Sequence, residues 1–329
     1  MFSKSSIPLL YKDTYTDKVG NFLLVYNPLS EKGIAVLNKE AAFLFKKIDN
    51  KKTLNEIFLI AKKIDPQVKI SDIIRIFSDF LSAEIIYFNS QRDKGKIFSK
   101  KPKELDVWFH ITNQCNLRCK YCYVWKSQDK MNKETAVKAI KKIIADAKKH
   151  KFKKITFKFS GGEPLLEFPL VLDLVHLGKK LAKKEKITVE FVVLTNGTLL
   201  TEKIAKKLKK EGIRAAVFLD GLEKYNDRQR VFSNGRGSFK HVEKGVQNLQ
   251  KAKAIFNVSV TITSKNIENI PDLTKYLLRR NIPFAFNFYR ENPYVSEELE
   301  GNDKKLVFYL KKAYKIILKL FMIIRLHIE

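Results

Sequence analysis

Cysteine is scarce in this chain: its 329 residues include only Cys115, Cys119 and Cys122, all in one short segment. An odd number of thiols is a poor basis for disulfides, because one thiol stays unpaired. Three ligands also fall short of the four that a structural zinc ion takes. Three closely spaced thiolates suit an iron–sulfur cluster that leaves one iron open for chemistry. The alternative interpretation is three unrelated cytosolic thiols.

Long apolar runs are also missing. No stretch is long and apolar enough to be a clean transmembrane span. The most apolar late segment, 306–324, is interrupted by lysines and therefore predicts an amphipathic helix. Residues 1–10 lack the apolar core and cleavage site of a signal peptide. These features predict a cytoplasmic protein that does not engage a membrane.

Acidic residues are outnumbered: 35 Asp and Glu face 64 Lys and Arg, which gives a formal net charge of +29. Such a charge is typical of proteins that bind nucleic acid. The excess is nearly all lysine on predicted helix faces such as 203–210, and no Arg-rich tract with interleaved aromatics occurs. Nucleic acid is therefore not expected as the main partner, and an acidic peptide fits the charge at least as well. Modification of tRNA is the alternative that the charge motivates, with a steep salt dependence of binding.

Residues 1–92 form one compositional unit. Strand patterns at 21–28, 34–38 and 85–88 surround three helix patterns, which begin near residues 39, 54 and 71. Asn38 and Thr53 stand where helix caps belong. This content predicts a small winged-helix-like α+β domain, followed by a polar, basic linker at 93–103.

Strands and helices alternate from residue 104 to residue 329. The predicted strands are 105–112, 154–159, 188–194, 214–219, 257–263 and 284–289. The predicted helices lie near 133–150, 169–184, 202–211, 239–253, 270–280 and 303–325. This alternation predicts a parallel sheet in a partial (β/α)6 TIM-like barrel, with its site at the C-terminal strand ends.

Polar groups follow successive predicted strands at that edge. The three cysteines follow the first strand, Ser160-Gly161-Gly162-Glu163 the second, Asn196 the third and Asp220 the fourth. The glycines would let a ligand approach the backbone closely, and Glu163 offers a carboxylate to a cation such as an α-ammonium group. Asn196 can hydrogen-bond a polar ligand. The alternative for each segment taken alone is a strand-to-helix turn.

CxxxCxxC after the first strand and GGEP after the second resemble the radical S-adenosylmethionine (SAM) enzymes, over about residues 104–290. Tyr121, directly before Cys122, matches the aromatic residue that this family prefers. The resemblance implies that the three thiolates bind a [4Fe-4S] cluster whose open iron is chelated by SAM. It also implies SAM contacts from Tyr121, Ser160, Gly161, Gly162, Glu163 and Asn196. One-electron reduction from a flavodoxin- or ferredoxin-type donor would release a 5′-deoxyadenosyl radical that abstracts hydrogen from the substrate.

A narrower resemblance is to the SPASM-type subgroup that modifies peptides and sulfatases. The residues that match this subgroup are Asp220-Gly221, the segment 226–230 and the segment 235–239. By this resemblance Arg230 meets the SAM carboxylate. Phe218 stands where a SAM-contacting serine is common, which puts that one contact in doubt, and Asn226 stands where histidine is common. Asp220 is the predicted substrate contact.

The subgroup usually continues into a cysteine-rich extension with auxiliary clusters, and this chain has no cysteine after Cys122. We therefore expect no auxiliary cluster here. Two expectations remain open: a chain that naturally lacks this extension, or a chain truncated after about residue 325.

The N-terminal unit resembles the PqqD-like domains that recognise precursor peptides in ribosomal peptide pathways, through residues 35–42, 48–57 and 80–87. In that family a leader peptide adds as a strand to the sheet edge; the alternative is a packing module without a peptide. Together the resemblances imply a radical SAM enzyme that modifies a ribosomally synthesised peptide. The alternatives are a sulfatase-type protein maturase and a non-catalytic peptide-binding remnant.

Overall fold

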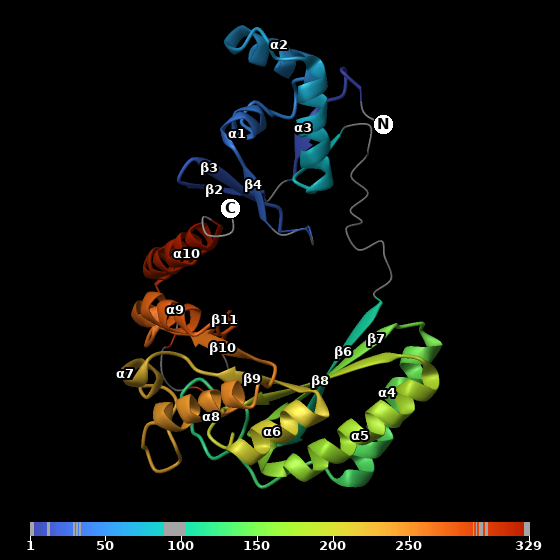
Figure 1. Ribbon diagram of the computed structural model, residues 1–329, viewed down its shortest axis with the longest axis vertical. Helices are drawn as coiled ribbons and strands as arrows, with labels where there is room; N and C mark the ends of the chain where they lie inside the picture. The colour runs from blue at the N-terminus through green and yellow to red at the C-terminus, as the bar shows by residue number, and fades with distance from the viewer. Residues whose placement is uncertain are drawn as a thin grey trace. The chain divides into compact units, whose positions relative to one another are not determined.

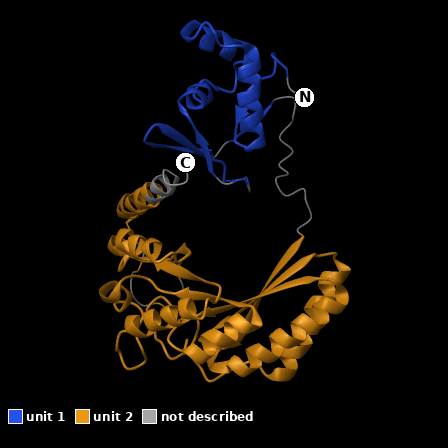
Figure 2. Cartoon of the chain, viewed as in Figure 1, with its two compact units in different colours: residues 1–101 blue, residues 102–329 orange. Residues whose placement is uncertain are grey.

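The structure is a computed structural model that describes residues 3–11, 14–28, 30, 32, 34–88, 103–291, 293, 295, 299 and 302–325 (Figure 1). Contacts divide the chain into two compact units, Met1–Lys101 and Pro102–Glu329 (Figure 2). The predicted linker at 93–103 lies outside the described residues, apart from Lys103.

The first unit contains two small antiparallel sheets and a set of helices. Strands β2 (Tyr15–Val19), β3 (Phe22–Tyr26) and β4 (Ile34–Leu37) form one sheet, and β1 (Pro8–Leu10) pairs with β5 (Ile86–Phe88). The helices are α1 (Lys39–Phe45), α2 (Leu54–Ile64) and α3 (Ile70–Ser82). The sequence pattern did not predict β1 and β2. The winged-helix-like character of this unit stays a prediction.

Local capping explains where two of these helices begin. The side chain of Asn38 accepts a hydrogen bond from Ala41 N at 2.9 Å and caps α1. Thr53 and Glu56 form a reciprocal capping box at the start of α2. Each cap satisfies backbone donors that have no partner inside the helix, so the helix starts where the sequence predicts.

The second unit is built on one six-stranded parallel sheet in the order β11-β10-β9-β8-β7-β6. Its strands are β6 (Glu104–Thr112), β7 (Lys154–Gly161), β8 (Thr188–Thr195), β9 (Ile213–Phe218), β10 (Phe256–Ile262) and β11 (Phe284–Phe288). Its helices are α4 (Lys133–Lys149), α5 (Phe168–Glu185), α6 (Glu202–Glu211), α7 (Glu223–Asn226), α8 (Phe239–Lys251), α9 (Ile270–Arg279) and α10 (Asp303–Arg325), with short 3-10 turns at Pro164–Glu167 and Ile267–Asn269. The α/β fold with a six-stranded parallel sheet is as predicted.

The strand order explains why one face of this sheet stays open. Each new strand adds to the same edge, and right-handed crossovers then place the connecting helices on a single face. α4, α5, α6, α8 and α9 follow the strands in this way (Figure 1). Buried side chains such as Phe157, Phe159 and Val193 fill the space between strands and helices. The opposite face carries polar side chains such as Lys158 beside apolar ones such as Trp108 and Leu194.

No helix among the described residues is both long enough and apolar enough to cross a membrane.

Candidate active site

The three cysteines lie on the loop that leaves the C-terminal end of β6. This loop pairs with a segment that follows α7, more than a hundred residues later in the sequence. Arg118 N donates to Val231 O at 2.7 Å and Lys120 N donates to Gln229 O at 2.9 Å. The loop is therefore held by backbone hydrogen bonds from the opposite half of the sheet.

Burial raises the pKa of two of these thiols. It raises the pKa of the Cys119 thiol to about 12, and it also raises the pKa of Cys115. Both thiols are therefore protonated near neutral pH in the metal-free chain, and binding iron would displace their protons.

All three cysteines line one cavity of about 280 Å³. Within the described ranges, no three His, Cys, Asp or Glu side chains are arranged to hold a single metal ion.

Gly161 and Gly162 let two loops meet. A Cβ on Gly161 would lie 2.3 Å from Thr112 O, and one on Gly162 would lie 2.0 Å from Gln114 O. Gly161 also has a φ of +122°, which L side chains rarely adopt. Gly162 N donates to Thr112 O at 2.6 Å. The close approach that these glycines permit is to the backbone of the cysteine loop, and both glycines also line the cavity.

Glu163 is fully buried and its carboxylate joins two strand ends. It accepts hydrogen bonds from Leu165 N at 3.0 Å, Thr195 Oγ1 at 2.8 Å and Asn196 N at 2.7 Å. Burial raises its pKa to about 7, against these hydrogen bonds. Glu163 does not line the cavity, so its predicted contact with a ligand ammonium group stays a prediction.

Asn196 faces the cysteine loop. Its Nδ2 donates to Asn116 Oδ1 at 2.8 Å and lies 3.7 Å from Cys115 Sγ. Thr198 N donates to its Oδ1 at 3.0 Å. Asn196 therefore links the end of β8 to the first cysteine, and it lines the cavity as well.

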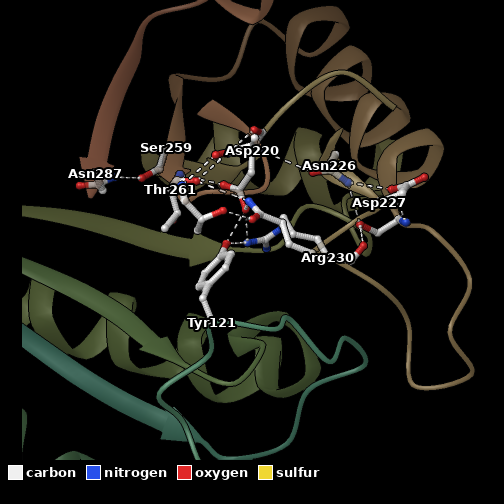
Figure 3. Close-up of polar contacts among 12 residues, drawn as sticks. Tyr121, Asp220, Asn226, Asp227, Arg230, Ser259, Thr261 and Asn287 are labelled. Atoms are coloured by element: carbon white, nitrogen blue, oxygen red, sulfur yellow. Dashed lines mark hydrogen bonds and ion pairs between the residues drawn. The ribbon is translucent and has the colours of Figure 1, made fainter. Parts of the chain in front are cut away.

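A buried polar cluster connects the cysteine loop to the end of β9 (Figure 3). Tyr121 Oη donates to Asp220 Oδ2 at 2.5 Å, and Arg230 Nη1 donates to Tyr121 Oη and lies 3.4 Å from Asp220 Oδ2. Burial raises the pKa of Tyr121 well above its usual value, so the phenol stays protonated. Thr261 N donates to Asp220 Oδ1 at 2.8 Å. Asp220 is fully buried and does not line the cavity, so a substrate contact would require its partners to move.

Arg230 is 4% exposed and still reaches the cavity. Its guanidinium carbon lies 5.5 Å from the ring centre of Phe218, which occupies the position where serine was expected. Among the described residues, Arg230 Nε is one of two buried polar side-chain atoms that have no hydrogen-bond partner. A buried donor without a partner fits an anionic ligand group such as a carboxylate.

The segment before α8 holds Arg230 in place. Asn226 Nδ2 donates to Ser238 Oγ at 3.1 Å, and Ser238 Oγ donates to Arg230 O at 2.8 Å. Asp227 Oδ1 accepts from Ser238 N at 2.9 Å. A Cβ on Gly237 would lie 2.0 Å from Asp227 Oδ2, so only glycine fits there. Asn226, which replaces the expected histidine, thus takes part in this support.

The cavity brings together most of the predicted site residues and several unpredicted ones. The predicted residues at its wall are Cys115, Cys119, Tyr121, Cys122, Ser160, Gly161, Gly162, Asn196 and Arg230. Sequence reasoning did not single out Trp108, Lys126, Leu194, Thr261, Asn287, Phe288, Tyr289 and Arg290. The strand-end rule could have found Asn287 to Arg290, because they end and follow β11 at the same edge. Lys126 has no comparable signal in the sequence.

Comparisons with known proteins agree with this site. The model of the family described as Radical SAM superfamily matches residues 109–277. The Fe-coproporphyrin III synthase of Methanosarcina barkeri is 32% identical over 187 residues, which are 56% of this chain and 44% of that protein. A cysteine-type anaerobic sulfatase-maturating enzyme of Clostridium novyi is 26% identical over 182 residues, 53% of this chain and 47% of that protein. The chain spans about half the length of these curated relatives.

A solved structure shares the fold. Native anSMEcpe with bound AdoMet and Kp18Cys peptide superposes with a TM-score of 0.60 at 23% sequence identity. The match covers 67% of this chain and 61% of that chain.

Proposed function

The chain belongs to the radical SAM superfamily, and from that premise we propose that it cleaves SAM reductively and modifies a ribosomally synthesised peptide by hydrogen abstraction. The observation that carries the proposal is the cavity wall, where the three cysteines, the Gly-Gly turn and the buried Arg230 meet. We assign residues 1–92 to peptide recognition, 93–103 to a linker and 104–329 to the catalytic barrel.

A [4Fe-4S] cluster and SAM are the cofactors of this superfamily, and the described residues fit both. Cys115, Cys119 and Cys122 would hold the cluster, and the partnerless Nε of Arg230 offers a donor for the SAM carboxylate. When bound, the two cofactors supply a carbon radical that abstracts hydrogen from the substrate.

The chain's own residues bind, orient and shield. Ser160, Gly161, Gly162 and Asn196 form the wall beside the cysteines, where the methionine amine of SAM is expected. Tyr121 stays protonated, and its Oη accepts a hydrogen bond from Arg230 Nη1, which fixes the guanidinium group. Apolar side chains such as Leu194 and Phe218 complete the wall and limit the access of water to a radical. A flavodoxin- or ferredoxin-type protein would supply the electron.

The first unit supports a peptide as substrate. β4 pairs with β3 on one side only among the described strands, so its other edge is open to an added strand. Strand addition to such an edge is an established way to bind peptides. The PqqD-like resemblance points to the same use of this unit.

Anaerobic reconstitution of the full-length chain tests the proposal. With SAM and dithionite it should form 5′-deoxyadenosine, and peptides translated from short reading frames beside its gene should bind and change in mass. If the chain binds a cluster but forms no 5′-deoxyadenosine, the result would contradict SAM cleavage and favour the non-catalytic peptide-binding remnant. A mass change in a sulfatase fragment alone would favour the sulfatase-type maturase.

A second candidate follows from the 32% identity to an Fe-coproporphyrin III synthase, because this relative acts in porphyrin chemistry. Binding of Fe-coproporphyrin III to the reconstituted chain, read from its visible absorption band, would support a porphyrin. Peptide binding without porphyrin binding would argue against it.

A further inference from the structure

Lys126 is a charged side chain whose ammonium group contacts the sulfur of a predicted cluster ligand. Its Nζ donates to Cys122 Sγ at 3.1 Å, and the side chain is half-buried at the cavity wall. Across the described part of the chain, no carboxylate lies within ion-pair distance of Lys126. Its charge is therefore directed to the sulfur.

The contacts of the other thiols are different. Cys115 Sγ accepts from Leu117 N at 3.4 Å and lies near the Asn196 amide, and both of these donors are neutral. Cys119 lies near Arg230, which already pairs with Asp220. A direct, charged N–H···S contact is thus found at Cys122.

We propose that Lys126 is a positioning residue that fixes Cys122 and raises the reduction potential of the [4Fe-4S] cluster; this rests on the proposed function, because it requires a cluster on these cysteines. Hydrogen bonds to sulfur and local charge set the potential of such clusters. Reduction adds one electron and no proton, so the reduced cluster is more negative than the oxidised one. A fixed cation beside a ligand sulfur stabilises the reduced form more.

The competing role for Lys126 is that of a cation for the SAM carboxylate, because Lys126 lines the same cavity. The two roles separate when SAM is absent. A cluster-tuning lysine shifts the potential without SAM, whereas a SAM-binding lysine changes only the affinity for SAM.

The test is an EPR-monitored redox titration of the anaerobically reconstituted full-length chain without SAM. We expect Lys126→Gln to make one-electron reduction about tenfold less favourable, which is a midpoint about 59 mV more negative. Lys126→Arg, which keeps the charge, should stay close to wild type. Lys138→Gln is the matched control: Lys138 lies on the surface of α4 in an ion pair with Glu134, and its loss should leave the potential unchanged.

Iron content decides the remaining outcomes. Iron lost in Lys126→Gln but kept in Lys126→Arg supports the proposal, because charge then holds the ligand. Loss of iron from both Lys126→Gln and Lys126→Arg overturns it, because the shape of the lysine side chain and not its charge would then hold the ligand. Full iron with an unshifted potential also overturns it, and so does an equal shift in Lys138→Gln. A wild-type chain that binds no cluster refutes the proposed function itself, which is a separate result.

Discussion

Each unit carries helices on one face of a sheet, and the uncovered faces differ in the side chains they expose. In the first unit, Ile34 and Val36 on β4 are 57% and 60% exposed. In the second unit, the uncovered face carries ion pairs such as Lys158 with Asp106 at 2.5 Å. An apolar open face is typical of a surface that binds another chain. The open face of the second unit mixes charged and apolar side chains: Lys158 Nζ lies 5.6 Å from the ring centre of Trp108. This face can therefore offer both polar and apolar contacts above the strands.

The largest expected difference between the units comes from Cys119→Ala. This change removes the thiol of a predicted cluster ligand in the second unit and leaves the sequence of the first unit unaltered. We expect iron content and 5′-deoxyadenosine formation to fall to background, while peptide binding by the first unit persists. Iron analysis, product chromatography and a peptide titration check this. Full iron content in the variant would contradict the proposed cluster ligands.

Arg230→Met should destabilise only the second unit. It leaves the buried carboxylate of Asp220 without its cation, which costs roughly 3–5 kcal/mol. For a unit of this size that lowers its melting temperature by about 6–20 °C. Calorimetry should show one transition moving and the other fixed. The double variant with Asp220→Asn should recover part of the loss, and a double variant no more stable than the single one would argue against the pair.

Glu163→Gln should change the pH dependence of the second unit. The pKa of Glu163 is raised from 4.5 to about 7 in the folded chain. A raised acid pKa stabilises the fold below pH 4.5, and this contribution is lost as the pH rises through about 7. Since one pKa unit corresponds to about 1.4 kcal/mol, the wild type should lose roughly 3 kcal/mol over this range.

The glutamine variant should lose much less across the same interval in urea titrations at pH 5 and pH 8. Glu134→Gln, on the surface of α4, serves as the control and should follow the wild type. Parallel pH profiles for Glu163→Gln and the wild type would show that the carboxylate does not hold a proton in the fold.

The smallest effect is expected on the apolar open face of the first unit. Val36→Thr keeps the branched shape of an exposed side chain, so stability should change by about 0.5 kcal/mol or less. The buried neighbour Val25→Ala should cost roughly 1–3 kcal/mol. If the open face binds peptide, Val36→Thr should nevertheless weaken peptide binding. Calorimetry measures the change in stability, and fluorescence titration measures the change in peptide binding. Equal stability losses in Val36→Thr and Val25→Ala would show that the two faces of the sheet do not differ.

Periodic features were predictable from the sequence. Alternating strands and helices in the second unit follow from hydrophobic spacing, and their order in the sheet follows from the crossover rule. The cysteine loop and the Gly-Gly turn could be placed at one sheet edge because parallel strands end together there. Asn38 and Thr53 act as caps because a cap depends only on neighbouring residues.

Side-chain direction in turns was not predictable. Glu163 and Asp220 point into the protein and satisfy their oxygens there, because a turn has no fixed alternation to reveal which side chains face a cavity. Lys126 reaches Cys122 through the path of an irregular loop. The contact of Phe218 with Arg230 depends on the path of the chain between β9 and α8, which local spacing does not reveal.

The pairing of the cysteine loop with residues 229–232 also has a consequence for synthesis on the ribosome. Leu117 bridges to Phe232, and Arg118 N bonds to Val231 O, yet the second segment is translated about a hundred residues later. At roughly 5–20 residues per second, the three thiols emerge about 5–20 s before the segment that pairs with their loop. Until that segment follows, the loop lacks these backbone hydrogen bonds, and its thiols are open to solvent and to oxidation.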